Sequence, residues 1–154
     1  MSVVAFRSGI MVADTSGECN DRRLPGTKLL TNGTIIVGMA GDDADAQRAA
    51  RWVLDGADPA KPVVWFPWES GSWKPNFGLL VWDGERLDYY GSTFIPAPVS
   101  PVKPTRGFNY DLFFAVGSGA EAALGAMHMG ATAEEAVRVA MRVNVGVWGD
   151  VETL

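Results

Sequence analysis

The chain has very few of the residues on which metal and disulfide chemistry depend, with one cysteine and one histidine among 154 residues. A single cysteine, Cys19, excludes a disulfide within the chain and favours a reducing compartment. His128 lies between two methionines in an alanine-rich stretch with no cysteine nearby, so we expect it to pack or to lie at the surface. The sequence therefore predicts neither a metal site nor a bound cofactor.

Long apolar runs and an excess of positive charge are also absent. No segment reaches the roughly 18–20 consecutive apolar residues of a membrane-spanning helix. The N-terminus lacks the basic start and apolar core of a signal peptide. A net charge of −5 argues against a nucleic-acid binder, which needs a basic face. We expect a cytoplasmic protein with no membrane or nucleic-acid partner, folded as one domain over residues 1–154.

Turn signals between apolar segments predict three β-hairpins. The paired segments are 3–7 with 10–14, 28–31 with 34–40, and 77–82 with 86–90. Single strands are predicted over 63–66, 112–116 and 145–151. The polar stretch 15–26 and the proline-rich stretches 57–75 and 95–104 are predicted as loops. The stretch 57–75 also contains three tryptophans.

Apolar residues at helical spacing predict three helices, over about 43–55, 118–129 and 132–143. The third begins with a capping box of Thr132 and Glu135. Its predicted inner face is Ala136, Val139, Ala140 and Val143. Helices and hairpins are grouped rather than alternating, which indicates an α+β fold built of stacked layers.

One stretch matches a nucleotide-binding motif. Residues 117–122, Gly-Ser-Gly-Ala-Glu-Ala, follow a predicted strand and open a helix, as the G-x-G-x-x-A fingerprint requires. That motif also needs a parallel strand next and an acid at its tip about twenty residues on. Here the position twenty residues on lies inside the last helix, so we expect the glycines to serve a tight turn.

Other nucleophile arrangements fit less well. A Ser-His-Asp triad would have to use His128, and no serine lies in a G-x-S-x-G elbow, since Ser118 is preceded by Val-Gly and followed by Gly-Ala. The cysteine has no evident base, which argues against thiol catalysis. The acids in 42–45 suit a helix N-terminus, where the helix dipole favours negative charge.

The start of the chain offers a different nucleophile. Ser2 follows Met1 directly, and methionine is usually removed when the next residue is as small as serine. Removal would leave a free α-amino group and a hydroxyl on one residue, and the amine can then act as the base for the hydroxyl. Taken alone, the same residues also fit the ordinary start of a hairpin.

Several motifs, in order, resemble one family. They are Ser2-Val-Val-Ala-Phe6, Met11-Val-Ala-Asp14, Lys28, Val37-Gly-Met-Ala-Gly41, Ala115-Val-Gly-Ser-Gly119, Ala122-Ala-Leu-Gly-Ala-Met127 and 130–138. Together they resemble proteasome β subunits and the bacterial HslV peptidase, and most of all the short proteasome-like proteins of bacterial and phage genomes. The resemblance covers residues 1–56 and 112–145. It implies a four-layer αββα sandwich, with a shortened first helical layer because 57–75 replaces its second helix.

The resemblance also implies roles for individual residues. Ser2 takes the place of the nucleophile, usually a threonine, and Lys28 the place of a lysine whose charge lowers the pKa of groups near it. Asp14 takes the place of the acid that holds this lysine. A backbone N–H near Gly41 would form the oxyanion hole, and Ser118 takes the place of a serine that hydrogen-bonds toward the terminal amine.

Besides serine at the nucleophile position, a site position near the end of the chain departs from the family. Asn144 stands where the family has an acid, and Val-Gly-Val-Trp-Gly follows it in place of a Ser-Gly-Gly-like turn. The function implied is amide-bond hydrolysis by a peptidase with Ser2 as nucleophile. The alternative is a catalytically inactive protein of the same fold that acts as a structural or partner-binding homo-oligomer.

The expected partners are other copies of the chain and a peptide or protein substrate. Six tryptophans in a small domain favour an exposed aromatic patch, and such patches mark interfaces. We therefore expect a homo-oligomer, with a ring among its candidate forms. The sequence leaves open whether an ATPase unfoldase is a further partner.

Overall fold

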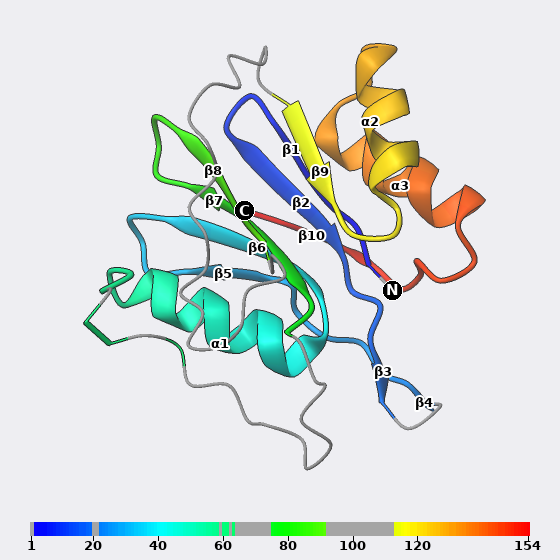
Figure 1. Ribbon diagram of the computed structural model, residues 1–154. Helices are drawn as coiled ribbons and strands as arrows, with labels where there is room; N and C mark the ends of the chain where they lie inside the picture. Colours follow the sequence, from blue (N-terminus) through cyan, green and yellow to red (C-terminus); the bar gives the residue numbers. More distant parts are fainter. Residues whose placement is uncertain (1, 20–21, 59, 62, 64–74, 92–112) are drawn as a thin grey trace.

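The computed structural model describes residues 2–19, 22–58, 60–61, 63, 75–91 and 113–154. Two four-stranded antiparallel sheets face each other, and three helices cover their outer faces (Figure 1). This agrees with the mixed fold of grouped hairpins and helices that the sequence predicts. Among the described residues, no helix is long and apolar enough to cross a membrane.

The first sheet contains the N-terminal hairpin and has the strand order β10-β2-β1-β9. Its strands are β1 (Val4–Arg7), β2 (Ile10–Asp14), β9 (Phe113–Val116) and β10 (Val151–Thr153). Ser8 and Gly9 both have positive φ, 52° and 85°, as a two-residue turn matching the strand twist requires. The predicted first hairpin is confirmed, with Val4 opposite Ala13.

The second sheet contains the other two predicted hairpins and has the order β5-β6-β7-β8. Its strands are β5 (Leu29–Thr31), β6 (Ile36–Gly41), β7 (Phe77–Trp82) and β8 (Leu87–Gly91). The predicted loop 15–26 also contains a short ladder, β3 (Glu18–Cys19) with β4 (Arg22–Arg23). A two-residue ladder is too short to show an alternating pattern of apolar residues, so periodicity could not predict it.

Helical structure covers the outer face of each sheet (Figure 1). Helix α1 (Asp43–Leu54) packs on the second sheet, and α2 (Ala120–His128) and α3 (Ala133–Val143) pack on the first. Both sides of the predicted capping box form, because Thr132 and Glu135 bind each other's backbone N–H groups. Among the described residues α1 is the only helix against the second sheet.

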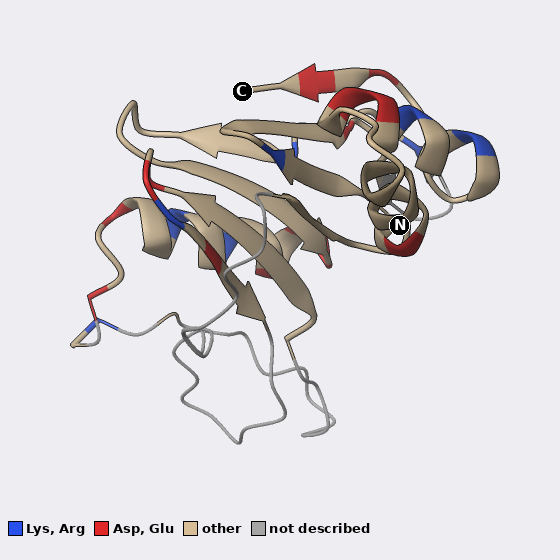
Figure 2. Cartoon of the chain, turned by 90° about the horizontal axis from the view of Figure 1, so that it is seen from above, with Lys and Arg blue, Asp and Glu red and all other residues tan. Residues whose placement is uncertain are grey.

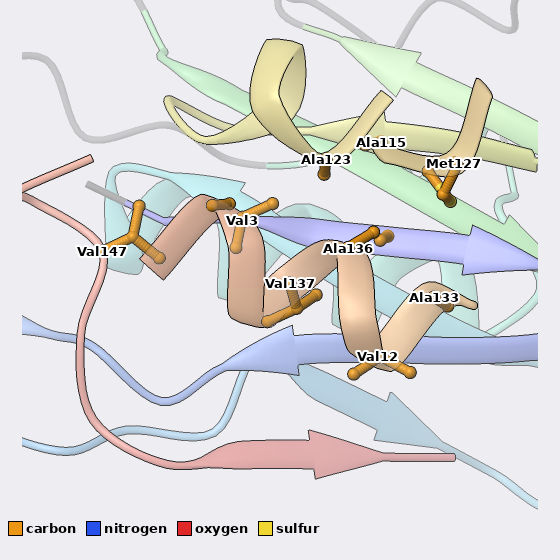
Figure 3. Packing of buried hydrophobic residues seen from close by; sticks show 11 residues of the cluster. Val3, Val12, Ala115, Ala123, Met127, Ala133, Ala136, Val137 and Val147 are labelled. Carbon is orange, nitrogen blue, oxygen red and sulfur yellow. The ribbon is translucent and has the colours of Figure 1, made fainter. Parts of the chain in front are cut away.

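The core therefore lies in three apolar layers. One is between the first sheet and α2 and α3, where alanines such as Ala123 and Ala136 let the helices approach the sheet closely (Figure 3). The second lies between the two sheets and contains Phe6, Met11 and Leu80. The third lies under α1. Figure 2 shows charged residues mainly on the helices and at strand ends, while most of each sheet is uncharged.

Two details of the predicted C-terminal region are wrong. Val139 and Val143 were predicted to face inward on α3, but their exposed fractions are 36% and 67%, and Ala133 and Val137 are buried instead. Valines occupy both candidate faces, so their spacing alone does not select one. The last strand begins at Val151, because the chain turns at 145–146 and bends at Gly149, which has φ 94°.

Several predictions lie wholly or partly outside the described residues. These are the strand over 63–66, the loops over 57–75 and 95–104, and three of the tryptophans. The other three, Trp52, Trp82 and Trp148, are half-buried. His128 is exposed and meets the edge of the Phe113 ring at 4.9 Å between ring centroids, a packing contact of the kind expected from the sequence.

Packing between the sheets should be sensitive to a single methyl group at Gly38. A Cβ there would lie 2.4 Å from Val4 Cγ1 and 2.6 Å from Met11 Sδ. We expect Gly38→Ala to destabilise the protein by about 1–3 kcal/mol through overpacking. The matched control is Gly125→Ala in α2, where a Cβ meets nothing within 4 Å and alanine should stabilise the helix by about 0.5–1 kcal/mol. Urea unfolding of both variants measures the difference, and equal stabilities would contradict the close approach of the sheets.

Candidate active site

Ser2 lies just before β1 and is held by the turn between β9 and α2. It is 4% exposed, and its N–H donates to Ser118 Oγ at 3.1 Å. The Ser118 hydroxyl donates back to the Ser2 carbonyl oxygen at 3.3 Å, and the Gly119 N–H donates to the same oxygen at 3.1 Å. The nitrogen of Ser2 and the Ser118 side chain, 116 residues apart, are thus in direct contact.

The glycines around Ser118 allow this close approach. Gly117 has φ 98°, and a Cβ on it would lie 2.2 Å from the Ser2 carbonyl oxygen and 3.2 Å from Ser2 Oγ. A Cβ on Gly119 would lie 2.9 Å from Val3 Cβ. β9 pairs antiparallel with β1, and every strand pair in the described chain is antiparallel, so the motif does not form a nucleotide-binding βαβ unit.

Asp14, at the end of β2, is fully buried and binds four donors. Its Oδ1 accepts the N–H of Val3, the residue directly after Ser2, at 2.6 Å. Its Oδ2 accepts the Ser16 N–H at 2.9 Å, the Ser16 hydroxyl, and Lys28 Nζ at 2.8 Å. A buried carboxylate is tolerated only when it is paired in this way.

Lys28, just before β5, completes the charge pair. Besides Asp14 Oδ2, its Nζ donates to the Asp14 carbonyl oxygen at 3.0 Å, to the Ser16 carbonyl oxygen, and to Ser16 Oγ at 3.2 Å. Its side chain is 12% exposed. Burial lowers the pKa of Lys28 from its ordinary value of 10.5, and the negative charges of Asp14, Glu152 and Asp43 partly oppose this.

A cavity of about 300 Å³ lies beside Ser2, which forms part of its lining. Ser16, Lys28 and Gly41 also line it, and a second hollow is shared by Ser2, Gly41 and Ser118. Gly41 has φ 111°, and a Cβ there would lie 2.4 Å from the Asn76 carbonyl oxygen, so only glycine fits where β6 ends. The structure therefore places Gly41 at the same opening as Ser2.

Asn144 contacts the group next to Ser2 rather than Ser2 itself. Its Nδ2 donates to the Ser118 carbonyl oxygen at 2.9 Å, and its Oδ1 accepts the Gly146 N–H at 3.0 Å. The Gly146 contact fixes which end of the amide is the oxygen. Ser2 and the predicted Lys28, Gly41 and Ser118 thus line the two hollows. Asp14 binds the N–H of the residue after Ser2, and Asn144 reaches the site only through Ser118.

Sequence reasoning missed two polar side chains at this site. Ser16 binds Asp14 and Lys28, and its only local signal is its place two residues after an aspartate, where side-chain-to-backbone bonds are common. Glu152 binds the Lys28 backbone from the last strand. The acids of 42–45 serve α1, since Asp42 caps it and Asp45 accepts the Asn76 N–H.

Known proteins were compared with the chain by family model, by sequence and by structure. No family model and no curated protein matches. Solved structures match over nearly the whole chain. Eukaryotic HslV from Trypanosoma brucei matches with a TM-score of 0.62 and 19% sequence identity. The match covers 99% of this chain and 98% of the HslV chain. The Thiobacillus denitrificans protein BPH matches with a TM-score of 0.64 and 15% sequence identity. The match covers 99% of this chain and 96% of the BPH chain.

The chain has the proteasome- and HslV-like N-terminal nucleophile (Ntn) fold. A second structure of BPH, in complex with epoxomicin, matches equally well, with a TM-score of 0.64 and 14% identity. The resemblance found in the sequence motifs is confirmed for the fold. Because these identities are below 20%, the chemistry of this Ntn-fold chain has to be argued from its own site.

Proposed function

We propose that this chain is an Ntn peptidase that hydrolyses amide bonds with Ser2 as nucleophile after removal of Met1. The proposal includes the four-layer αββα organisation of a single domain over 1–154, and self-assembly into a homo-oligomer. The observation that carries it is the position of the Ser2 nitrogen, 3.1 Å from Ser118 Oγ and one residue before the N–H that Asp14 binds. An N-terminal base needs such anchoring to stay beside its own hydroxyl.

Removal of Met1 turns the Ser2 amide nitrogen into a primary amine with a free electron pair. This amine takes the proton of Ser2 Oγ, directly or through water, while Oγ attacks the substrate carbonyl carbon. Ser118 Oγ can go on accepting an N–H of this amine, which leaves the electron pair free to face Ser2 Oγ. The Lys28 ammonium, bound to Asp14 and lining the same cavity as Ser2, disfavours protonation of the amine and stabilises the developing negative charge.

The attack forms a carbon–oxygen bond and a tetrahedral oxyanion. We assign its stabilisation to a backbone N–H near Gly41, which shares both hollows with Ser2. As the carbon–nitrogen bond of the substrate breaks, the protonated amine of Ser2 returns its proton to the leaving group. Water, activated by the same amine, then hydrolyses the ester on Ser2. Serine lacks the methyl that restricts the threonine rotamer, so turnover should be slower than with threonine.

The rate at which a peptide epoxyketone labels Ser2 should depend on pH in a bell shape. It should rise as the α-amine loses its proton, near its ordinary pKa of about 7.7–8.0 or below. It should fall again as Lys28 loses its proton, at a pH below 10.5 because burial lowers the Lys28 pKa. Stopped-time labelling followed by mass spectrometry measures the profile. A rate that keeps rising to pH 10.5 would contradict the role given to Lys28.

The second candidate function is an inactive protein of this fold that serves as a structural or partner-binding homo-oligomer. Asn144 favours it, because its amide donates to the Ser118 carbonyl oxygen, a bond that a carboxylate cannot make. The Asn144 side chain therefore makes a structural hydrogen bond and supplies no negative charge to the site. Labelling separates the two candidates, since a protein that lacks Met1 and never reacts with the epoxyketone would favour the inactive one. Light scattering tests the oligomer that both candidates share, and a monomer at micromolar concentration would contradict it.

A further inference from the structure

Glu152 connects the edge of the first sheet to the start of the second. It lies on β10, opposite Ala13 of β2 and therefore next to the register position of Asp14. Its carboxylate accepts the Thr27 hydroxyl at 2.5 Å and the Lys28 N–H. Thr27 and Lys28 immediately precede β5 in the other sheet. These two bonds therefore join segments about 124 residues apart at the position from which the Lys28 side chain departs.

The Lys28 backbone is fixed on both sides. Its N–H is bound by Glu152, and its carbonyl oxygen accepts the Met39 N–H of β6 at 2.8 Å. A lysine side chain has four rotatable bonds, so a fixed backbone decides how well Nζ stays within reach of its acceptors. Here Nζ must reach the Asp14 carboxylate and the Ser16 carbonyl oxygen at the same time.

We propose that Glu152 is a positioning residue for the Ser2 site, holding the Lys28 backbone so that Nζ reaches Asp14 and adding a second negative charge near the ammonium. This rests on the proposed function, since Lys28 matters for chemistry only if Ser2 is the nucleophile. Three acidic groups act on the Lys28 ammonium through their charge: Asp14 from β2, Glu152 from β10 and Asp43 from α1. Asp42 also lines the cavity, and the Ser2 amine faces it once Met1 is removed. Burial acts against the protonated lysine, and the three carboxylates act for it.

Two variants separate the backbone contact from the charge. Glu152→Gln keeps an oxygen that can accept the Lys28 N–H but removes the charge, whereas Glu152→Ala removes both. We expect Glu152→Gln to keep the labelling rate of Ser2 near neutral pH and to move the upper limb of the pH profile to lower pH. We expect Glu152→Ala to move that limb as well and to lower the rate roughly tenfold to hundredfold, as a misplaced group does. The matched control is Glu134→Gln, in an exposed ion pair of α3. It should change neither the labelling rate nor the upper limb of the pH profile.

A second readout does not depend on activity. The chain has four lysines, so ¹³C labelling of the lysine ε carbons allows the Lys28 titration to be followed by NMR. Loss of the Glu152 charge should lower the midpoint of the Lys28 titration in Glu152→Gln, whether or not Ser2 reacts. If wild-type protein lacking Met1 does not label while this midpoint still moves, the proposed function fails and the contact stands. If Glu152→Gln leaves the Lys28 midpoint and the upper pH limb unchanged, the role given to the Glu152 charge is overturned. If Glu152→Ala labels at the wild-type rate, the positioning of the Lys28 backbone by Glu152 is overturned. Should Glu152→Ala not fold, Glu152→Asp, which keeps the charge but shortens the reach to the Lys28 N–H, replaces it as the test of positioning.

Discussion

Ser2→Ala should lose covalent labelling by a peptide epoxyketone and peptide hydrolysis by roughly 10³-fold or more, because the reaction then has no hydroxyl to form the ester. The fold should be kept, since the contacts that hold residue 2 use its backbone N–H and carbonyl oxygen. Mass spectrometry measures the labelling, and a fluorogenic peptide measures the hydrolysis.

The matched control for this variant is Ser8→Ala. Ser8 is an exposed serine in the turn at the opposite end of β1, so its loss should leave both rates unchanged. Light scattering should show the same particle size for wild type and Ser2→Ala, because self-assembly does not depend on the nucleophile. Full labelling of Ser2→Ala would mean that another residue reacts, and the assignment of the nucleophile would then be wrong.

Asp14→Ala should produce the largest loss of stability, about 3–5 kcal/mol in the free energy of unfolding. The substitution leaves the Lys28 ammonium, only 12% exposed, without its carboxylate partner, and it removes the acceptor of the Val3 and Ser16 N–H groups. For a chain of this length the melting temperature should fall by roughly 10 °C or more. Calorimetry or urea unfolding measures the loss.

An exposed ion pair provides the comparison for Asp14. Glu134→Ala breaks the pair with Arg138 on α3, where both side chains are more than half exposed, and should cost less than about 1 kcal/mol. Asp14→Asn should also destabilise the protein, because its amide NH₂ would face the donors of Lys28 and Ser16. If Asp14→Ala costs no more than Glu134→Ala, the buried pair does not organise the site as described.

Local sequence features predicted those parts of the fold that short-range physics controls. The hairpin turns at Ser8-Gly9 and Asn32-Gly33 and the capping box at Thr132 each depend on residues within a few positions of one another. The buried face of α3 did not follow from spacing, because valines stand on both candidate faces and contact with the first sheet decides between them. Packing, which acts between distant segments, supplied the missing information.

The candidate site shows the same division. Ser2, Lys28 and Ser118 could be proposed because their motifs resemble a family in order and spacing, although they are far apart in the sequence. Ser16 and Glu152 belong to no such motif, and Glu152 reaches Lys28 only because β10 pairs with β2. Contacts made by strand pairing between the two ends of a chain leave no local pattern, so they had to come from the structure.

The central claim, that Ser2 is an N-terminal nucleophile, is tested most directly by intact mass and peptide mapping of the wild-type protein after treatment with a peptide epoxyketone. We predict that Met1 is absent, that one inhibitor molecule adds per chain, and that the adduct maps to Ser2 through both its nitrogen and its Oγ. Folded protein that retains Met1 and carries no adduct would contradict the claim.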